Sequence, residues 1–148
     1  MAITGEYVPS KAQWVRDQVE QFEASNGQEA NTLPGTDYPI VVITNVGAKS
    51  GYVRKTPLMR VERDGVYVAI ASKGGAPEHP VWYHNLTADP DALMVQDGAD
   101  RWDATVRELG GDERQEWWDR AVAAYPPYAE YQTRTDRLIP VLLAERRT

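Results

Sequence analysis

The stretch IVVITNVGAKSGYVRKTPLMRVERDGVYVAIAS, residues 40–72, predicts the fold of this chain. It opens with a β-branched run over residues 40–46, which is typical of a buried strand. A glycine-bounded turn leads to a second predicted strand over 55–62. The hairpin signal Arg63-Asp64-Gly65 then precedes a third strand over 66–72. Strands joined by turns this short pair in antiparallel fashion, so the stretch predicts an antiparallel sheet.

Further elements are predicted on both sides of these three strands. An N-terminal arm leads into a helix over 11–24, in which Val15, Val19 and Phe22 share one face. After the third strand we expect a short helix over 81–88, strands over 92–96 and 101–109, a helix over 113–124, a tyrosine-rich loop and a last strand over 138–144. Six short strands with peripheral helices predict a mainly β (α+β) fold built as a small closed or split barrel.

Size and composition limit the function classes. The 148 residues fit one domain, 1–148, with the arm and first helix occupying about 1–25. The absence of cysteine excludes disulfides and thiolate catalysis. No apolar run reaches the ~18 residues of a membrane span, and the N-terminus lacks the apolar core of a secretory signal, so we expect a cytoplasmic protein without stable membrane insertion. The sequence pI of about 4.9 argues against nucleic-acid binding.

Two common kinds of catalytic centre find no support in the sequence. The only histidines, His79 and His84, are five residues apart and form no recognised metal signature, so we expect no metal site. The chain also lacks the G-x-S-x-G motif of serine hydrolases.

Positive charge is gathered in one segment, residues 47–75. This segment carries six basic residues against two acidic ones, whereas the whole chain has a net charge of −6. A turn with Lys49 and Ser50 lies at its start, and its N–H groups, hydroxyl and ammonium would suit a phosphate. The alternative is an ordinary hairpin turn with a solvated lysine. The charge pattern favours a pocket for a negatively charged small molecule.

Three more cations lie on or beside the second predicted strand. On an ideal strand Arg54 and Arg60 share one face, and Lys55 points to the other. They would either contact the anion or be solvated and paired with nearby acids. The sequence leaves both possibilities open.

Three further segments are candidates for lining the pocket. The glycine pair in residues 72–75 leaves backbone amides bare, unless the loop is simply flexible. In residues 81–85 one aromatic would enter the core while another lines a pocket, with Asn85 available to a ligand carbonyl. Tyrosines at 125, 128 and 131 would cover a planar ligand or pack over the barrel end.

The combination of these motifs resembles the deazaflavin (coenzyme F-420)-dependent nitroreductase family of actinobacteria. The resemblance is carried by AKSG, RKTPLMRVERDG, ASKGGAPEHPVWYHNL and AAYPPYAEYQTRTDR, and it extends from the GEYVPS arm to the IPV strand. It implies a split β-barrel related to FMN-binding reductases. It also implies that reduced F-420 gives a hydride to an electron-poor small molecule: a quinone, an activated alkene (enone) or a nitroaromatic.

The resemblance also assigns roles to residues of this chain. Ala48, Lys49 and Ser50 would meet the coenzyme's phosphate and oligoglutamate tail, although relatives often have arginine at the position of Ala48. Tyr128 and Tyr131 would be catalytic, with Tyr128 covering the coenzyme face where the acceptor enters. The remaining implied coenzyme contacts are Arg54, Lys55, Thr56, Pro57, Leu58 and Met59 along the strand, Ile70, Ala71, Ser72 and Lys73 beside the ring, and Val81, Trp82, Tyr83, His84 and Asn85 across it.

Several alternatives stay open at this level. The same pocket would also serve a non-catalytic F-420 carrier, and the barrel would also accommodate FMN or haem. We expect a monomer or a homodimer. A lipid-soluble quinone would add peripheral contact with a membrane.

Overall fold

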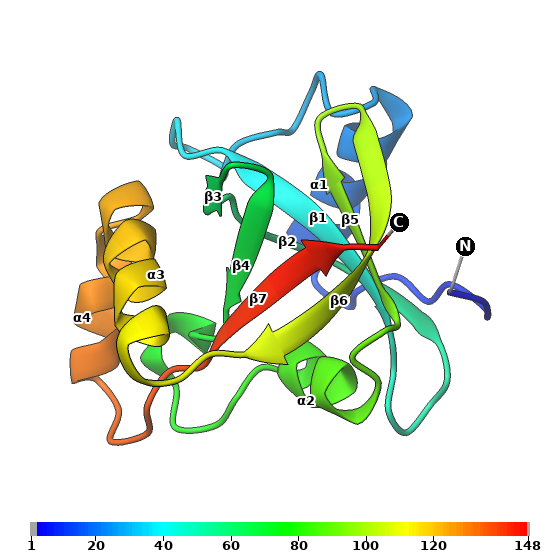
Figure 1. Cartoon of the computed structure of the whole chain (residues 1–148). Helices are drawn as coiled ribbons and strands as arrows, with labels where there is room; N and C mark the ends of the chain where they lie inside the picture. The colour runs from blue at the N-terminus through cyan, green and yellow to red at the C-terminus, as the bar shows by residue number, and fades with distance from the viewer. Residues whose placement is uncertain (1–2, 148) are drawn as a thin grey trace.

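The structure is a computed structural model that describes residues 3–147. Seven strands form one antiparallel sheet in the order β2-β1-β5-β6-β7-β4-β3. The sheet curls into a half barrel (Figure 1), which confirms the predicted mainly β, split-barrel fold. The strands are β1 (Ile40–Val46), β2 (Val53–Met59), β3 (Glu62–Arg63), β4 (Val66–Ile70), β5 (Leu93–Asp97), β6 (Asp100–Glu108) and β7 (Val141–Arg146).

The second predicted strand, 55–62, is wrong in one informative respect. It is two strands, β2 and β3, which lie at opposite ends of the sheet order. The two residues between them, Arg60 and Val61, therefore carry the chain from one sheet edge to the other. Asp97 stabilises this closure, because it accepts hydrogen bonds from Arg60 Nε at 2.8 Å and from the Tyr67 hydroxyl on β4.

Four α-helices and one 3-10 turn surround the sheet within residues 3–147. Helix α4 replaces the predicted tyrosine-rich loop, because Tyr128 packs against β4 and β7. Pro127 is compatible with the start of this helix, since the first helical N–H groups have no intrahelical partner. The last strand begins at Val141 rather than 138, directly after Pro140, which has no N–H to give a ladder. The elements are α1 (Gln13–Ala24), η1 (Lys73–Gly75), α2 (Val81–Ala88), α3 (Gly111–Ala124) and α4 (Pro127–Thr133).

Both faces of β1 are buried, which explains its continuous β-branched run. Val41 and Ile43 point into the barrel core, whereas Ile40 and Val42 pack against Phe22 and its neighbours on α1. Because successive side chains of a strand point to opposite faces, one run serves two cores.

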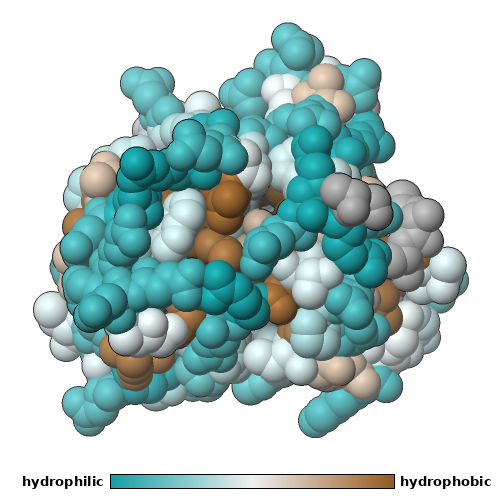
Figure 2. All heavy atoms as spheres, in the orientation of Figure 1, coloured by the Kyte–Doolittle hydropathy of each residue, from teal (hydrophilic) through white to brown (hydrophobic). Residues whose placement is uncertain are grey.

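The same alternation places α4, the tyrosine helix that carries Tyr128 and Tyr131, beside the barrel. On β4, Ala69 faces the barrel core, while Val68 and Ile70 pack against Trp117 of α3 and Tyr128 of α4. Figure 1 shows α3 and α4 together on one side of β4, with α2 below β6 and β7. On the face seen in Figure 2, much of the apolar colour lies in recesses bordered by polar side chains. The candidate site lies where β2 and the end of β4 come close to η1 and α4.

No helix within residues 3–147 is long and apolar enough to cross a bilayer. The described chain also contains no group of three or more His, Cys, Asp or Glu side chains placed to hold a metal ion.

Candidate active site

A cavity of about 490 Å³ lies between α1, β2, the loop after β4, the start of α2 and α4. Its volume is in the range of small-molecule sites, and its walls are mostly apolar and aromatic. Polar groups enter at a few points, from Thr56, Ser72, Lys73 and the tyrosines. The lining residues are Trp14, Val15, Leu33, Thr56, Pro57, Leu58, Met59, Ile70, Ser72, Lys73, Gly74, Pro80, Trp82, Tyr125, Tyr128 and Tyr131.

Strand β2 is an edge strand, and this explains how it forms a wall of the cavity. One side of β2 pairs with β1 over its whole length, and beyond it only the N-terminal arm adds a bridge at Val53. Pro57 is compatible with an edge position, because it has no N–H to donate to a second neighbour. Within residues 3–147 no further strand pairs with the free side of β2, so the stretch from Thr56 to Met59 faces the cavity.

The tyrosine helix and Tyr125, which lies at the end of α3, supply weakly acidic hydroxyl groups. The hydroxyls of Tyr125 and Tyr131 lie 3.1 Å apart. Burial, and then the hydrogen bond with Tyr131, raises the pKa of Tyr125 to about 12. Tyr128 is only 5 % exposed, and burial raises the pKa of its hydroxyl well above the ordinary range. The hydroxyls of Tyr125 and Tyr128 therefore remain protonated at neutral pH and are available as hydrogen-bond donors.

The loop after β4 has a backbone that needs glycine. Gly75 has φ +84°, and a Cβ atom there would lie 2.6 Å from the Tyr131 carbonyl oxygen. Gly74 also has a positive φ, of +65°, but a Cβ there would meet nothing within 4 Å. The loop therefore abuts the tyrosine helix at Gly75, so the two walls of the cavity are fixed relative to each other.

The structure brings together about half of the residues implied by the family resemblance. The cavity is lined by Thr56, Pro57, Leu58, Met59, Ile70, Ser72, Lys73, Trp82, Tyr128 and Tyr131. The remaining implied residues do not line it: Ala48, Lys49, Ser50, Arg54, Lys55, Ala71, Val81, Tyr83, His84 and Asn85.

Some of these ten residues have roles inside the protein. Lys55 bonds both carboxylate oxygens of Glu23 on α1, at 2.6 and 2.8 Å. Ala71 is fully buried in the barrel core. Tyr83 donates a hydrogen bond to Glu108 at 2.5 Å, whereas Val81 remains largely exposed.

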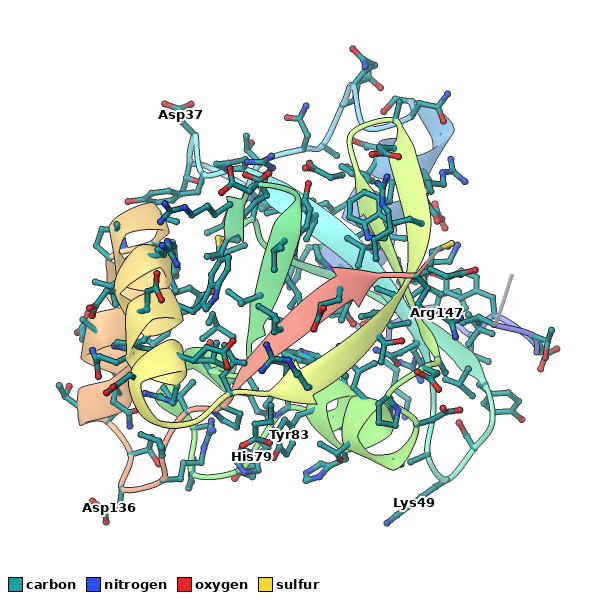
Figure 3. All side chains as sticks on the ribbon, in the orientation of Figure 1. Asp37, Lys49, His79, Tyr83, Asp136 and Arg147 are labelled. Atoms are coloured by element: carbon teal, nitrogen blue, oxygen red, sulfur yellow. The ribbon has the colours of Figure 1, made fainter. Side chains whose placement is uncertain are left out.

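Asn85 fastens the β1–β2 turn. Its Oδ1 accepts a hydrogen bond from the Ala48 N–H at 2.9 Å, and its Nδ2 donates to Asn45 Oδ1 at 3.1 Å. Both asparagines are buried. Lys49 lies at the tip of this turn and points away from the body of the protein (Figure 3). The turn is therefore anchored at its base and presents its charge to solvent.

Four lining residues were not predicted from the sequence: Trp14, Val15, Leu33 and Pro80, whereas Gly74 and Tyr125 belong to segments that the sequence had already made candidates. Trp14 had a detectable signal in the sequence, since this large aromatic residue lies off the apolar face of the first helix. In the structure its side chain is 55 % exposed. Tyr125 belongs to the same tyrosine motif as Tyr128. Leu33 had no local signal, because its place in the cavity depends on how the 28–39 loop folds back.

Comparison with known proteins adds family information. Residues 14–146 match the family model described as F420H(2)-dependent quinone reductase. An F420H(2)-dependent quinone reductase of Mycobacterium tuberculosis strain H37Rv is 33% identical over 129 residues, which cover 85% of each chain.

Two solved structures are also similar. One, titled as an F420-H2 dependent reductase (FDR-A), has 60% identity and a TM-score of 0.68, covering 72% of this chain and 94% of the other. The other, titled as a domain-swapped dimer, has 51% identity and a TM-score of 0.71, covering 92% of this chain and all of the other. The residues matched by the family model include every lining residue of the cavity.

Proposed function

The chain belongs to the family of F420H(2)-dependent quinone reductases, and from this premise we propose that it reduces a quinone with a hydride from reduced coenzyme F-420. The observation that carries the proposal is the cavity, which assembles the β2 wall, the loop after β4 and the tyrosine helix around one space of about 490 Å³. Enones and nitroaromatics are further candidate acceptors, because they accept a hydride at an electron-poor centre in the same way.

The residues present fit this coenzyme. Its planar ring requires an apolar, flat-walled space, which Pro57, Leu58 and Trp82 offer. Its anionic tail requires unpaired cations nearby. Lys49 and Arg54 have no carboxylate within ion-pair distance among residues 3–147, so we assign the tail to them. The bound coenzyme supplies two electrons as a hydride, and the protein supplies position and polarity.

The protein's own groups then determine how an acceptor is oriented. Strand β2 and Trp82 would hold one side of the ring, leaving the tyrosine helix to face the acceptor. A quinone that gains a hydride and a proton becomes a hydroquinone, and negative charge builds on its oxygen during the transfer. The hydroxyls of Tyr128 and Tyr131 would donate hydrogen bonds to that oxygen, and the proton would follow from a tyrosine or from water. The apolar walls exclude bulk water, which strengthens these bonds.

Anaerobic mixing tests the proposal. We expect the wild-type protein to oxidise reduced F-420 in the presence of menadione, seen as the return of the visible absorbance of the oxidised coenzyme. A heat-denatured sample is the control. Tight binding of F-420 without oxidation by any quinone, enone or nitroarene would favour a carrier instead. A yellow or red purified protein would favour FMN or haem.

The small-molecule acceptor is the only partner that we propose for the reaction. The oligomeric state stays a prediction, monomer or homodimer, although one of the similar solved structures is titled as a domain-swapped dimer. Light scattering of the purified protein distinguishes the two states.

A further inference from the structure

The side chain of Arg137 is the most heavily used hydrogen-bond donor near the cavity. Its guanidinium donates to the carbonyl oxygens of Ser72 at 2.8 Å, Ala76 at 2.9 Å and Ala71 at 3.1 Å. A fourth contact, 2.9 Å long, joins Nη1 to Nδ1 of His79. A planar guanidinium has five donors in fixed directions, so it holds several acceptors of a loop in one arrangement.

These acceptors all belong to the loop that forms one wall of the cavity. Residues 72–74 of this loop line the cavity, and its backbone is irregular, with positive φ at Lys73, Gly74 and Gly75. Apart from the short 3-10 turn η1, this segment lacks the regular hydrogen bonds of a helix or strand, so much of its shape depends on outside partners. Arg137 supplies these partners from the segment just after α4, and thereby links the loop to the tyrosine helix.

His79 completes the set only in its neutral form. A guanidinium has no acceptor, so Nδ1 of His79 must offer its lone pair, and the ring proton must lie on Nε2. The ring stacks on Tyr83 with centroids 4.4 Å apart, and Figure 3 shows the two side chains side by side. Protonation of His79 would remove the acceptor and place a second cation against Arg137.

The charges around His79 favour the neutral ring. Burial and the positive charge of Arg137 lower its pKa, with a smaller contribution from His84, whose ring lies 5.9 Å away. Glu108 acts in the opposite direction, but its carboxylate is engaged with the Tyr83 hydroxyl. Glu78, the neighbouring acid on the same loop, pairs with Lys73 at 3.1 Å.

We propose that Arg137 is a positioning residue that fixes the 71–79 loop for coenzyme binding, and that neutral His79 is its pH-sensitive fourth acceptor. The proposal rests on the proposed function for its ligand, but the state of the loop can be measured without any ligand. The pKa of His79 is lowered in the folded protein, so the contact is complete at neutral pH. It is lost as the pH falls below the ordinary histidine value of 6.5 and through the lowered one.

The first experiment compares Arg137→Lys with Arg134→Ala. Lysine keeps the charge but cannot reach four acceptors, whereas Arg134 donates to the loop only once, at 3.3 Å to Gly74, and is half exposed. In the protein without coenzyme, we expect Arg137→Lys to speed amide hydrogen exchange across residues 71–79. We expect it to weaken F-420 binding about tenfold in a fluorescence titration, and Arg134→Ala to change binding less than about twofold.

The second experiment tests the histidine. We expect F-420 binding to the wild-type protein to weaken as the pH falls below 6.5 and through the lowered pKa of His79. His79→Asn keeps an acceptor oxygen at every pH, so its binding should lose that pH dependence. His79→Phe keeps the stacking on Tyr83 but has no acceptor, so it should bind weakly at every pH.

The outcomes separate the two proposals. Equal hydrogen exchange in Arg137→Lys, Arg134→Ala and the wild type would overturn the positioning role, whatever the coenzyme does. An unchanged pH profile in His79→Asn would overturn the role of the histidine. Faster exchange in Arg137→Lys than in the wild type, together with no F-420 binding by the wild type, would overturn the proposed function and the ligand assigned to the loop. The Arg137 contacts would then have a structural role only.

Discussion

The two ends of the proposed coenzyme site are built in opposite ways. The ring end is a cavity whose walls come from α1, β2, the loop after β4, α2 and α4, and its key tyrosine, Tyr128, is almost fully buried. The tail end is one exposed turn, held at its base by Asn85, with Lys49 in solvent. We therefore expect binding at the ring end to depend on shape and on packing between distant segments, and binding at the tail end to depend on charge.

The comparison also shows why a cluster of positive charge in a sequence is a weak indicator of a site. Four of the six cations in residues 47–75 pair with carboxylates of the protein: Lys55 with Glu23, Arg60 with Asp97, Arg63 with Asp64 and Lys73 with Glu78. Only Lys49 and Arg54 are without such a partner among residues 3–147. Three of these carboxylates, Glu23, Asp97 and Glu78, lie outside the segment, so other parts of the acidic chain neutralise much of its positive charge.

The largest expected effect is a loss of stability on substituting Gly75, in the loop at the ring end. Gly75→Ala would place a methyl group against the Tyr131 carbonyl oxygen at a positive φ, so we expect it to lower the free energy of unfolding by about 3 kcal/mol. Gly74→Ala is the matched control, because it meets only the backbone strain and should cost about 1 kcal/mol. Urea denaturation measures both. Equal losses would show that the contact between the loop and α4 is not tight.

The corresponding substitution at the tail end is Asn85→Ala, which removes the side-chain hydrogen bonds that hold the β1–β2 turn. This change leaves the Ala48 N–H and the Asn45 side-chain Oδ1 without their partner, so we expect a loss of about 2 kcal/mol in stability. We also expect weaker F-420 binding, with the cavity unchanged. Thr87→Ala, on the exposed end of the same helix, is the control and should be nearly neutral. Normal coenzyme affinity in Asn85→Ala would mean that the turn does not bind the tail.

A smaller change tests the chemistry at the ring end. Tyr128→Phe keeps the ring and its packing against Tyr125 but removes the hydroxyl group. If the hydroxyl donates a hydrogen bond to the acceptor oxygen, kcat should fall about tenfold while the Kd of F-420 stays within twofold. Stopped-flow kinetics with menadione measures the first and fluorescence titration the second. An unchanged kcat would leave Tyr128 as a packing residue, one of the two roles that the sequence left open.

The smallest effect is expected at the tail end, and it should depend on salt. Lys49→Ala combined with Arg54→Ala should weaken F-420 binding about fivefold at low ionic strength, and less at high ionic strength, because exposed charges are screened. Lys55→Met is the control, since its ammonium is already bonded to Glu23. It should change stability more than coenzyme affinity. A salt-independent loss in the double variant would contradict an electrostatic role.

Much of the fold was predictable because it is encoded locally. The boundaries of β1 and α2 agree with the sequence prediction, since a β-branched run and a helix bounded by Pro80 and Asp89-Pro90 need no distant information. The two strands around the Gly98 turn agree within one residue. The errors occur where a distant partner decides. The 55–62 segment divides because its two halves join opposite edges of the sheet. The tyrosine segment forms a helix that packs on β4 and β7.

The candidate site was predictable only in part, for the same reason. The sequence alone determined that residues 56–59 form a strand, that the 72–75 loop is glycine-rich and that tyrosines follow the helix predicted over 113–124. Local sterics and turn chemistry suffice for each of these statements. Only the tertiary structure decided that these segments enclose one cavity and that Asn85 faces inward to a turn. It also decided that Lys55 and Arg60 are neutralised by acids 32 and 37 residues away. Ion pairs and pocket walls are relations between residues far apart in the chain, and strand order and register set those distances.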